Sequence, residues 1–222
     1  GPSVFWKKVI TRSLLIFAIG LFLNWSPFVE WKGEQLVAKR WENIRILGVL
    51  QRIATAYFFA SVIVYYAKAR GAFVLGAVIL IVYWVLCWLL GSPADPYSLA
   101  GYFGTETDKN ILGVTHMYKD EGVPFDPEEL TSTLPAIVQV IFGFLVGKFL
   151  RTRGNSYETI SWLFTAGLLL IFAGLCWDLV FPINKPIWSS SYVLYTTGLA
   201  TVILSMIIFV TDLKDQKSWS GA

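Results

Sequence analysis

Long runs of apolar residues, separated by short polar stretches, dominate the pattern along this chain of 222 residues. A helix that spans a membrane needs about 20 largely apolar residues, because in lipid its backbone must satisfy its own hydrogen bonds. Segments of about this length recur six times, so the sequence predicts an all-α, polytopic membrane helical bundle of about six transmembrane helices. The expected spans are 9–28, 46–66, 72–91, 134–150, 159–179 and 190–210.

The predicted spans differ in how purely apolar they are. The third, 72–91, contains no charged residue, whereas the second carries Arg45, Gln51 and Arg52 around its first turns. Between the third and fourth spans lies a loop of about 40 residues, 92–133. Loops of this length are commonly functional or disordered, and the aromatic residues and turn signals in this one favour an ordered, functional loop. The sequence therefore predicts one transmembrane domain with a single long polar loop.

Composition agrees with lipid as the solvent of these helices. Hydrophobic residues make up 55% of the chain and charged residues 15%, against roughly 25% charged in a typical soluble domain. Ten Trp and ten Tyr suit a protein that needs anchors at the membrane interfaces. The net charge of +3 is too small to indicate a nucleic-acid partner, so a lipid bilayer is the partner that composition predicts.

Basic residues are unevenly divided between alternate connections. The N-terminal stretch, the 67–71 turn, the 148–156 turn and the C-terminal end together hold ten basic and three acidic residues. The other connections hold eight basic and twelve acidic residues. Because connections rich in Lys and Arg stay on the cytoplasmic side, we expect both chain ends in the cytoplasm and the 92–133 loop outside.

The residue types indicate no metal site. Cys87 and Cys176 both lie inside apolar runs with no second cysteine nearby, so we interpret them as small hydrophobic residues. The single histidine, His116, lies in the long loop, where a structural or solvated role competes with a catalytic one. Carboxylates nearby in the sequence, Asp126 and Glu128 among them, could orient or charge its imidazole. The same carboxylates also suit the N-terminus of the next helix, an explanation that needs no ligand.

Arg45 and Arg52 are seven residues apart and so share one face of a helix, with Gln51 on the neighbouring stripe. Arginines inside a span are costly and usually face a cavity or a partner. Their guanidinium groups suit phosphate, sulfate or carboxylate ligands. The alternative is that Arg45 reaches to the headgroups and Arg52 pairs with a loop carboxylate.

The stretch before the last span contains Asn184, Lys185 and Trp188, followed by three serines. A lysine and a tryptophan at the entry to a membrane are ordinarily anchors, and serines before an apolar run ordinarily cap a helix. The residue types alone therefore do not require a ligand at this position.

Three stretches together carry a resemblance. They are RILGVLQRI at 45–53, FDPEELTSTLPAI at 125–137 and PINKPIWSSSYV at 182–193, each at the entry to a predicted span. In this order they resemble the heparan-alpha-glucosaminide N-acetyltransferase family and its bacterial relatives, and the resemblance covers nearly the whole chain. Glu129 stands where the family usually has glycine, and Leu47 where proline is common.

The resemblance implies a transmembrane acetyltransferase of a bacterial inner membrane. Such an enzyme would move an acetyl group from cytoplasmic acetyl-CoA, its co-substrate, to an amino sugar on the outer side. The family's catalytic histidine lies upstream of the first span found here, and family members continue beyond the last one. The chain is therefore expected to be a fragment that is inactive alone, with His116 matching a second, loop histidine.

The resemblance also suggests roles for the candidate residues. Arg45, Gln51 and Arg52 would line a cavity and hold an anionic part of CoA or of the sugar. Asp126 and Glu128 would position the amine or its proton, with His116 as a further catalytic candidate. Lys185 and Asn184 would close the outer rim, and Trp188 would help to bind substrate or cofactor. A membrane transporter or a scaffold without chemistry is the rival interpretation, because the spans contain few ionisable groups. The oligomeric state stays open, with a homodimer as one alternative.

Overall fold

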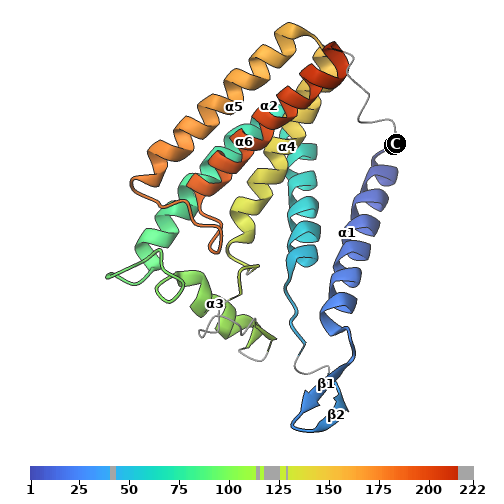
Figure 1. The fold of residues 1–222 in the computed structure, drawn as a ribbon, viewed down its shortest axis with the longest axis vertical. Coiled ribbons are helices and arrows are strands. Elements are labelled where there is room, and N and C mark those ends of the chain that lie inside the picture. The colour runs from blue at the N-terminus through green and yellow to red at the C-terminus, as the bar shows by residue number, and fades with distance from the viewer. Residues whose placement is uncertain (41–43, 114–115, 118–125, 129, 215–222) are drawn as a thin grey trace.

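The computed structural model describes residues 1–40, 44–113, 116–117, 126–128 and 130–214 (Figure 1). This part of the chain is mostly helical, as predicted. Its elements are α1 (Pro2–Trp25), β1 (Val29–Lys32), β2 (Gln35–Ala38), α2 (Val49–Leu90), α3 (Phe103–Leu112), α4 (Thr133–Arg153), α5 (Tyr157–Asp178), α6 (Ser190–Ile208) and a π-helical turn, Phe209–Leu213, that extends α6.

Helix α2 consists of two arms that meet at Lys68. Lys68 has φ 60° and ψ −175°, which breaks the helical path. A straight helix of 42 residues would be about 63 Å long, about twice the hydrocarbon thickness of a bilayer. The break divides α2 into arms that correspond to the predicted spans 46–66 and 72–91.

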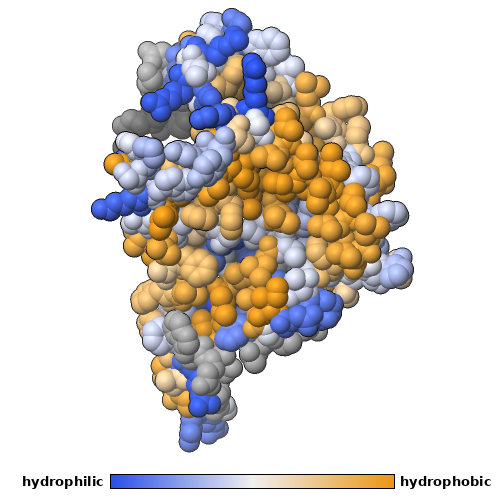
Figure 2. Space-filling model, turned by 180° about the vertical axis from the view of Figure 1, so that it is seen from behind, coloured by the Kyte–Doolittle hydropathy of each residue, from blue (hydrophilic) through white to orange (hydrophobic). Residues whose placement is uncertain are grey.

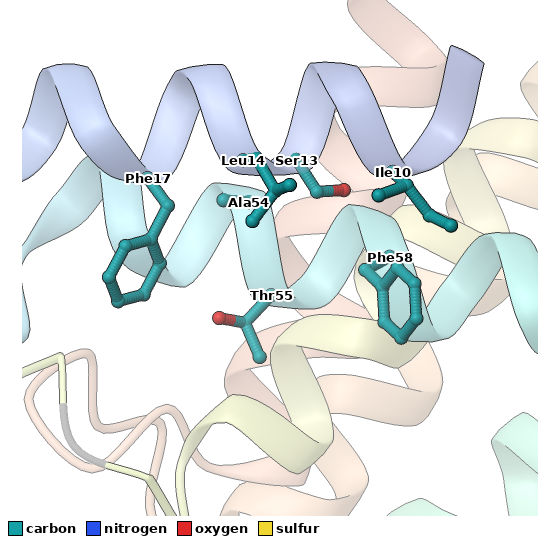
Figure 3. A pocket seen from close by; sticks show the side chains of 7 residues that line it. All are labelled: Ile10, Ser13, Leu14, Phe17, Ala54, Thr55 and Phe58. Carbon is teal, nitrogen blue, oxygen red and sulfur yellow. The ribbon is translucent and has the colours of Figure 1, made fainter. Parts of the chain in front are cut away.

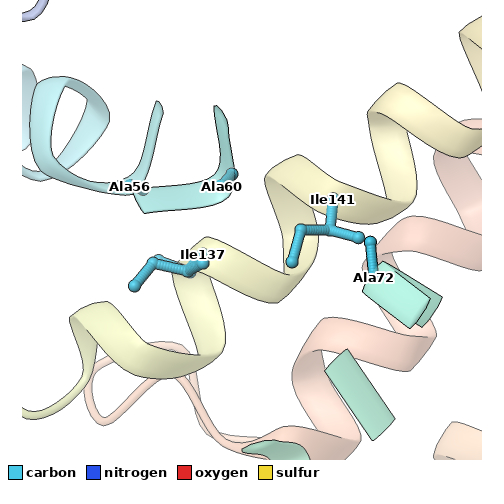
Figure 4. Close-up of a cluster of buried hydrophobic side chains, with 6 residues drawn as sticks. Ala56, Ala60, Ala72, Ile137 and Ile141 are labelled. Carbon is cyan, nitrogen blue, oxygen red and sulfur yellow. The ribbon is translucent and has the colours of Figure 1, made fainter. Parts of the chain in front are cut away.

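Both arms of α2 pack against α4 through small residues. Figure 4 shows Ala56 and Ala60 of the first arm beside Ile137, and Ala72 of the second arm beside Ile141. All five side chains are buried. Alanine at the contact lets the helix backbones approach closely, which is the usual way that helices associate in lipid.

Helices α5 and α6 approach each other most closely at glycines. A Cβ atom placed on Gly198 would lie 2.6 Å from the carbonyl oxygen of Gly167, closer than real Cβ contacts come. A Cβ atom on Gly174 would lie 3.0 Å from the carbonyl oxygen of Ser191. Only the absence of side chains at these positions permits the observed spacing.

Four helices in the described part of the chain are long and apolar enough to cross a membrane: α2, α4, α5, and α6 with its π-helical extension. Figure 2 shows apolar side chains spread over the middle of the molecule and hydrophilic ones gathered towards its two ends. These observations confirm the prediction of an integral membrane bundle. The number of about six spans, and the side of the membrane that each loop faces, stay predictions.

Helix α1 covers the first predicted span and packs on the first arm of α2. Between them lies a groove of about 250 Å³ (Figure 3). Its lining residues are Ile10, Ser13, Leu14, Phe17, Ala54, Thr55 and Phe58. None of these side chains is ionisable, so the groove provides a surface for apolar groups rather than for charged ones.

Two features of the connections depart from the prediction. Residues 29–38, expected as part of a loop in an all-α protein, form an antiparallel hairpin in which Trp31 lies opposite Leu36. Its turn contains Gly33 at φ 64°, a conformation that glycine adopts without strain. The long 92–133 loop contains α3, an amphipathic helix too short to span.

One end of the bundle brings together segments that are far apart in sequence. Figure 1 shows the hairpin, the start of α2, α3 and the N-termini of α4 and α6 at this end. The predicted site residues lie in or beside these segments, so the fold brings them to the same end of the bundle, although not all into one cluster.

Candidate functional site

Arg45, just before α2, binds the carboxylate of Asp126 with two nitrogens. Its Nε donates to Asp126 Oδ2 at 2.9 Å and its Nη2 to Asp126 Oδ1 at 2.5 Å. The same Nη2 also donates to Glu128. Asp126 is fully buried, whereas the Glu128 side chain is 15% exposed. The two-pronged pair therefore fixes Asp126 and leaves Glu128 as the accessible carboxylate.

Asp126 also shapes the backbone that follows it. Its Oδ1 accepts a hydrogen bond from the backbone nitrogen of Glu128 at 3.0 Å, the local contact that aspartate and asparagine make in turns. One side chain thus orders the turn before α4 and ties it to the start of α2.

Arg45 precedes α2, so the two arginines do not share one helical face as the sequence predicted; Arg52, in the first turn of α2, is 5% exposed. Its Nη2 donates to the carbonyl oxygen of Pro127 at 2.5 Å and to Ser132 Oγ. Its guanidinium lies 4.6 Å from the centroid of the Trp188 ring, a distance at which a cation attracts an aromatic face. Arg52 and Trp188 are therefore in contact, and the Arg52 guanidinium also binds two acceptors ahead of α4.

Trp188 connects Arg52 to a glutamine that sequence reasoning missed. The Trp188 Nε1 donates to Gln139 Oε1 at 3.0 Å, and Gln139 Nε2 donates to Thr196 Oγ1 at 3.3 Å. Gln139 is the lone amide in the apolar run of α4, and that isolation was the signal for a polar contact between helices.

Asn184 and Lys185 do not join this cluster. Asn184 donates through Nδ2 to the carbonyl oxygen of Tyr97 at 3.2 Å, and its backbone nitrogen donates to Ser189 Oγ at 2.9 Å. It therefore organises the turn that presents Trp188. Lys185 is exposed, and its carbonyl oxygen accepts from the Trp188 backbone nitrogen at 3.0 Å. The structure thus gives both residues a place in the turn, beside the cluster.

Gln51 is separated from Arg52 although the two are adjacent in sequence. It is fully buried against α1, where a Cβ atom on Gly20 would lie 2.6 Å from Gln51 Oε1. Successive residues of a helix point about 100° apart, so Arg52 faces α4 while Gln51 faces α1. The two arginines are brought together, and Gln51 instead marks the crossing of α1 and α2.

His116 contacts the backbone just before Arg45. Its Nδ1 lies 2.7 Å from the carbonyl oxygen of Ile44. A carbonyl oxygen accepts but does not donate, so Nδ1 carries the hydrogen and Nε2 of the neutral ring keeps a lone pair. His116 is therefore tied to the backbone beside Arg45, at the end of the bundle where the carboxylates lie. Asp120 and Glu121, acidic residues near it in sequence, lie outside the described residues.

Asp108 is a third carboxylate near the arginines, and sequence reasoning gave it no role. It lies on α3, is fully buried, and accepts from the backbone nitrogen of Leu130 at 3.3 and 3.4 Å. Burial raises the pKa of Asp108 to about 6, and the charge of Asp126 adds to this effect. The Leu130 hydrogen bond and the positive charge of Arg52 oppose the rise.

A groove of about 240 Å³ between α4 and α6 begins at Gln139. Glycines, hydroxyl residues and small apolar residues line it: Gly143, Val146, Gly147, Thr197, Ala200, Thr201 and Leu204. Within the described part of the chain, the Thr197 hydroxyl is buried and has no hydrogen-bond partner. The groove could hold a slender molecule that offers a polar group to Thr197.

No cluster of three or more His, Cys, Asp or Glu side chains suited to a metal occurs among the residues whose placement is described. The Arg45 and Arg52 cluster is instead a set of paired charges with one accessible carboxylate. Such an arrangement suits binding of a polar or cationic group.

The amino-acid sequence of the chain is similar to those of two known proteins. Heparan-alpha-glucosaminide N-acetyltransferase from Homo sapiens is 26% identical over 265 aligned positions, which cover 96% of this chain and 39% of that protein. The protein of the same name from Mus musculus is 24% identical over the same shares. The chain is a distant relative of these proteins. It spans about two fifths of their length, and no protein-family model matches it.

Proposed function

We propose that the chain forms part of a membrane N-acetyltransferase that passes an acetyl group from acetyl-CoA to an amino sugar across the bundle. The observation that carries the proposal is the groove that runs from Gln139 along α4 and α6. At its start, Gln139 accepts a hydrogen bond from the Trp188 indole, and the Arg52 guanidinium lies over the same indole ring. The distant relationship to proteins named N-acetyltransferases supports the same reaction.

The groove suits the pantetheine arm of acetyl-CoA. That arm is a narrow chain with amide groups, and the buried Thr197 hydroxyl is placed to hydrogen-bond one of them. From Gln139 to Gly147 the helix rises about 12 Å. Lys148 and Arg151 follow on the last turns of α4, where positive charge would attract the phosphates of CoA. On this proposal the donor enters from the end of the bundle that carries these basic residues.

The opposite end would receive the amino sugar. Glu128 is the accessible carboxylate there and would bind the sugar's ammonium or hydroxyl groups, while Arg45 holds Asp126 in a supporting position. The amine must lose a proton as it attacks the thioester carbonyl; the resemblance implies a histidine upstream of this chain as the principal acceptor, and Nε2 of His116 would assist it. The amine nitrogen forms its bond to the acetyl carbon as the C–S bond breaks. The proton taken from the amine passes to the sulfur, and CoA leaves as a thiol.

The test is acetyl transfer by the purified protein at its full natural length, reconstituted in vesicles. Radiolabelled acetyl-CoA is supplied on one side and glucosamine on the other, and labelled N-acetylglucosamine is measured. We expect transfer with acetyl-CoA on the side of Lys148 and Arg151 and none with the two sides exchanged. Uptake of glucosamine without acetylation would favour the rival interpretation as a transporter.

Two variants test the roles proposed for His116 and Glu128 at the amino-sugar end of the bundle. His116→Gln should reduce turnover by less than the roughly 10²–10⁴-fold that loss of the principal general base costs, because the resemblance implies that an upstream histidine supplies that base. Glu128→Gln should mainly raise the KM for glucosamine. Lys185→Gln serves as the control, because the Lys185 side chain is exposed and lies beside the cluster. Equal loss of activity in all three variants would contradict these assignments.

A further inference from the structure

A second groove lies between the second arm of α2, α4 and α5, and it shares Val146 and Thr197 with the groove between α4 and α6. It consists of two adjoining hollows, of about 290 Å³ and 500 Å³, that share Phe73 and Leu145. We call it the Phe73 groove. Its lining is mostly apolar and rich in aromatic rings, with Phe142, Phe149 and Trp162 among the residues that line it.

The Phe73 groove opens sideways, towards the surroundings of the bundle. Phe73, Val74 and Trp162 are 53%, 57% and 58% exposed. They lie on helices long and apolar enough to span a membrane, which places them at the depth of the bilayer hydrocarbon. A molecule in this groove would enter from the lipid rather than from water.

Positive charge marks one end of the Phe73 groove. Arg70 lines the hollow beside Leu145, and the Arg153 guanidinium lies 5.6 Å from the centroid of the Phe149 ring. Arg153 also pairs with Glu158 at 3.1 Å, an exposed contact that neutralises part of its charge. Arg70 makes no ion pair with any residue that the structure describes. The Phe73 groove thus ends at the Arg70 guanidinium, which can bind an anionic group.

We propose that the Phe73 groove binds an anionic phospholipid of the surrounding membrane. The acyl chain lies along Phe73, Phe142 and Leu145, and the phosphate group meets Arg70. Basic residues beside grooves between membrane helices recognise acidic headgroups in this way, and the apolar part excludes a free inorganic anion. The proposal does not depend on acetyl transfer.

Native mass spectrometry of the protein in detergent tests this site. The protein is mixed with equal amounts of phosphatidylglycerol and phosphatidylcholine, which differ in headgroup charge, and the bound copies of each are counted. We expect phosphatidylglycerol to be preferred, and Arg70→Gln to reduce that preference about fivefold, the effect expected of one basic residue near a headgroup.

Two further variants separate the groove from general charge. Arg12→Gln removes an exposed positive charge from α1, away from the groove, and should leave the preference unchanged. Ala166→Trp adds bulk inside the groove without changing charge and should reduce binding of both lipids. If Ala166→Trp fails to fold, the comparison of Arg70→Gln with Arg12→Gln still decides.

Three outcomes would overturn the proposal. Equal effects of Arg70→Gln and Arg12→Gln would mean that the lipid preference is spread over all basic residues. Unchanged lipid binding in folded Ala166→Trp would place the acyl chain elsewhere. Release of phosphatidylglycerol by added CoA would assign the groove to the water-soluble anion instead of the lipid.

Discussion

Arg52 and Trp188, 136 residues apart in sequence, lie with the guanidinium 4.6 Å from the indole centroid at the entry to the groove between α4 and α6. This contact joins the first arm of α2 to the turn before α6. The same arginine reaches Pro127 and Ser132 ahead of α4, so one side chain connects three helix N-termini.

Arg52→Lys should therefore destabilise the protein although it keeps the charge. Lysine lacks the planar fork and cannot hold Pro127, Ser132 and Trp188 at once. We expect a loss of about 1–3 kcal/mol, measured as a lower melting temperature in detergent. Arg12→Lys, at an exposed position on α1, is the matched control. Equal melting temperatures for both variants would show that the contacts of Arg52 contribute little.

Asp126→Asn should weaken the protein more than Glu128→Gln does. Asparagine can still accept from the Glu128 backbone nitrogen, so the turn is kept while the charge that faces Arg45 is lost. Breaking a buried ion pair costs about 3–5 kcal/mol, and partial exposure of Arg45 reduces this to about 2–4 kcal/mol. Thermal unfolding of both variants measures the difference. A larger effect of Glu128→Gln would mean that Arg45 depends chiefly on Glu128.

Asp108 should make stability depend on pH. The pKa of Asp108 is raised from the usual 3.8 to about 6. Between about pH 4 and pH 6, Asp108 is therefore mostly protonated in the folded protein and mostly ionised in the unfolded chain. Folding is therefore favoured below this window, and stability falls as pH rises through it. Asp108→Asn removes the effect, and above pH 6 the variant should be more stable by on the order of 1–3 kcal/mol.

The measurement for Asp108 is the melting temperature of Asp108→Asn minus that of the unaltered protein, from pH 4 to pH 7. We expect this difference to grow as pH rises. Glu106→Gln, on the exposed face of the same helix, should show no such growth. A constant difference for Asp108→Asn would mean that Asp108 ionises as an ordinary carboxyl group.

Cysteine labelling tests the predicted orientation. Ala94 and Thr152 are exposed and lie in connections that the sequence assigns to opposite sides. With the exposed Cys176 replaced by alanine, an impermeant thiol reagent should label Ala94→Cys in intact cells and Thr152→Cys only after lysis. Labelling of Thr152→Cys in intact cells would reverse the orientation.

The helices could be predicted from sequence because long apolar runs have one stable form in lipid. Lys68 and Arg70, between two such runs, also indicated where α2 breaks. The hairpin was missed because its strands have four residues each, too few for a clear alternation.

The candidate site was predictable only in part. The sequence identified Arg45, Arg52 and the acidic residues Asp126 and Glu128 as candidates. It left open whether each arginine contacts lipid headgroups, a carboxylate or a ligand. Arg45 binds Asp126, and Arg52 binds Pro127 and Ser132. These contacts join residues about 80 positions apart in sequence, so no local pattern encodes them. The burial of Asp108 and the separation of Gln51 from Arg52 are likewise set by which helix lies beside each face.

The glycine contact between α5 and α6 bears on the order in which the protein assembles. Gly167 and Gly198 let these two sequence neighbours pack backbone against backbone, so the pair can form as a unit soon after both helices enter the membrane. The turn that carries Trp188 joins them and would already have its shape at that stage, since Asn184 and Ser189 bond within the turn. Arg52 is synthesised much earlier than Trp188. The contact between them would therefore form only after α5 and α6 have inserted, which makes assembly of the site a late event in biogenesis.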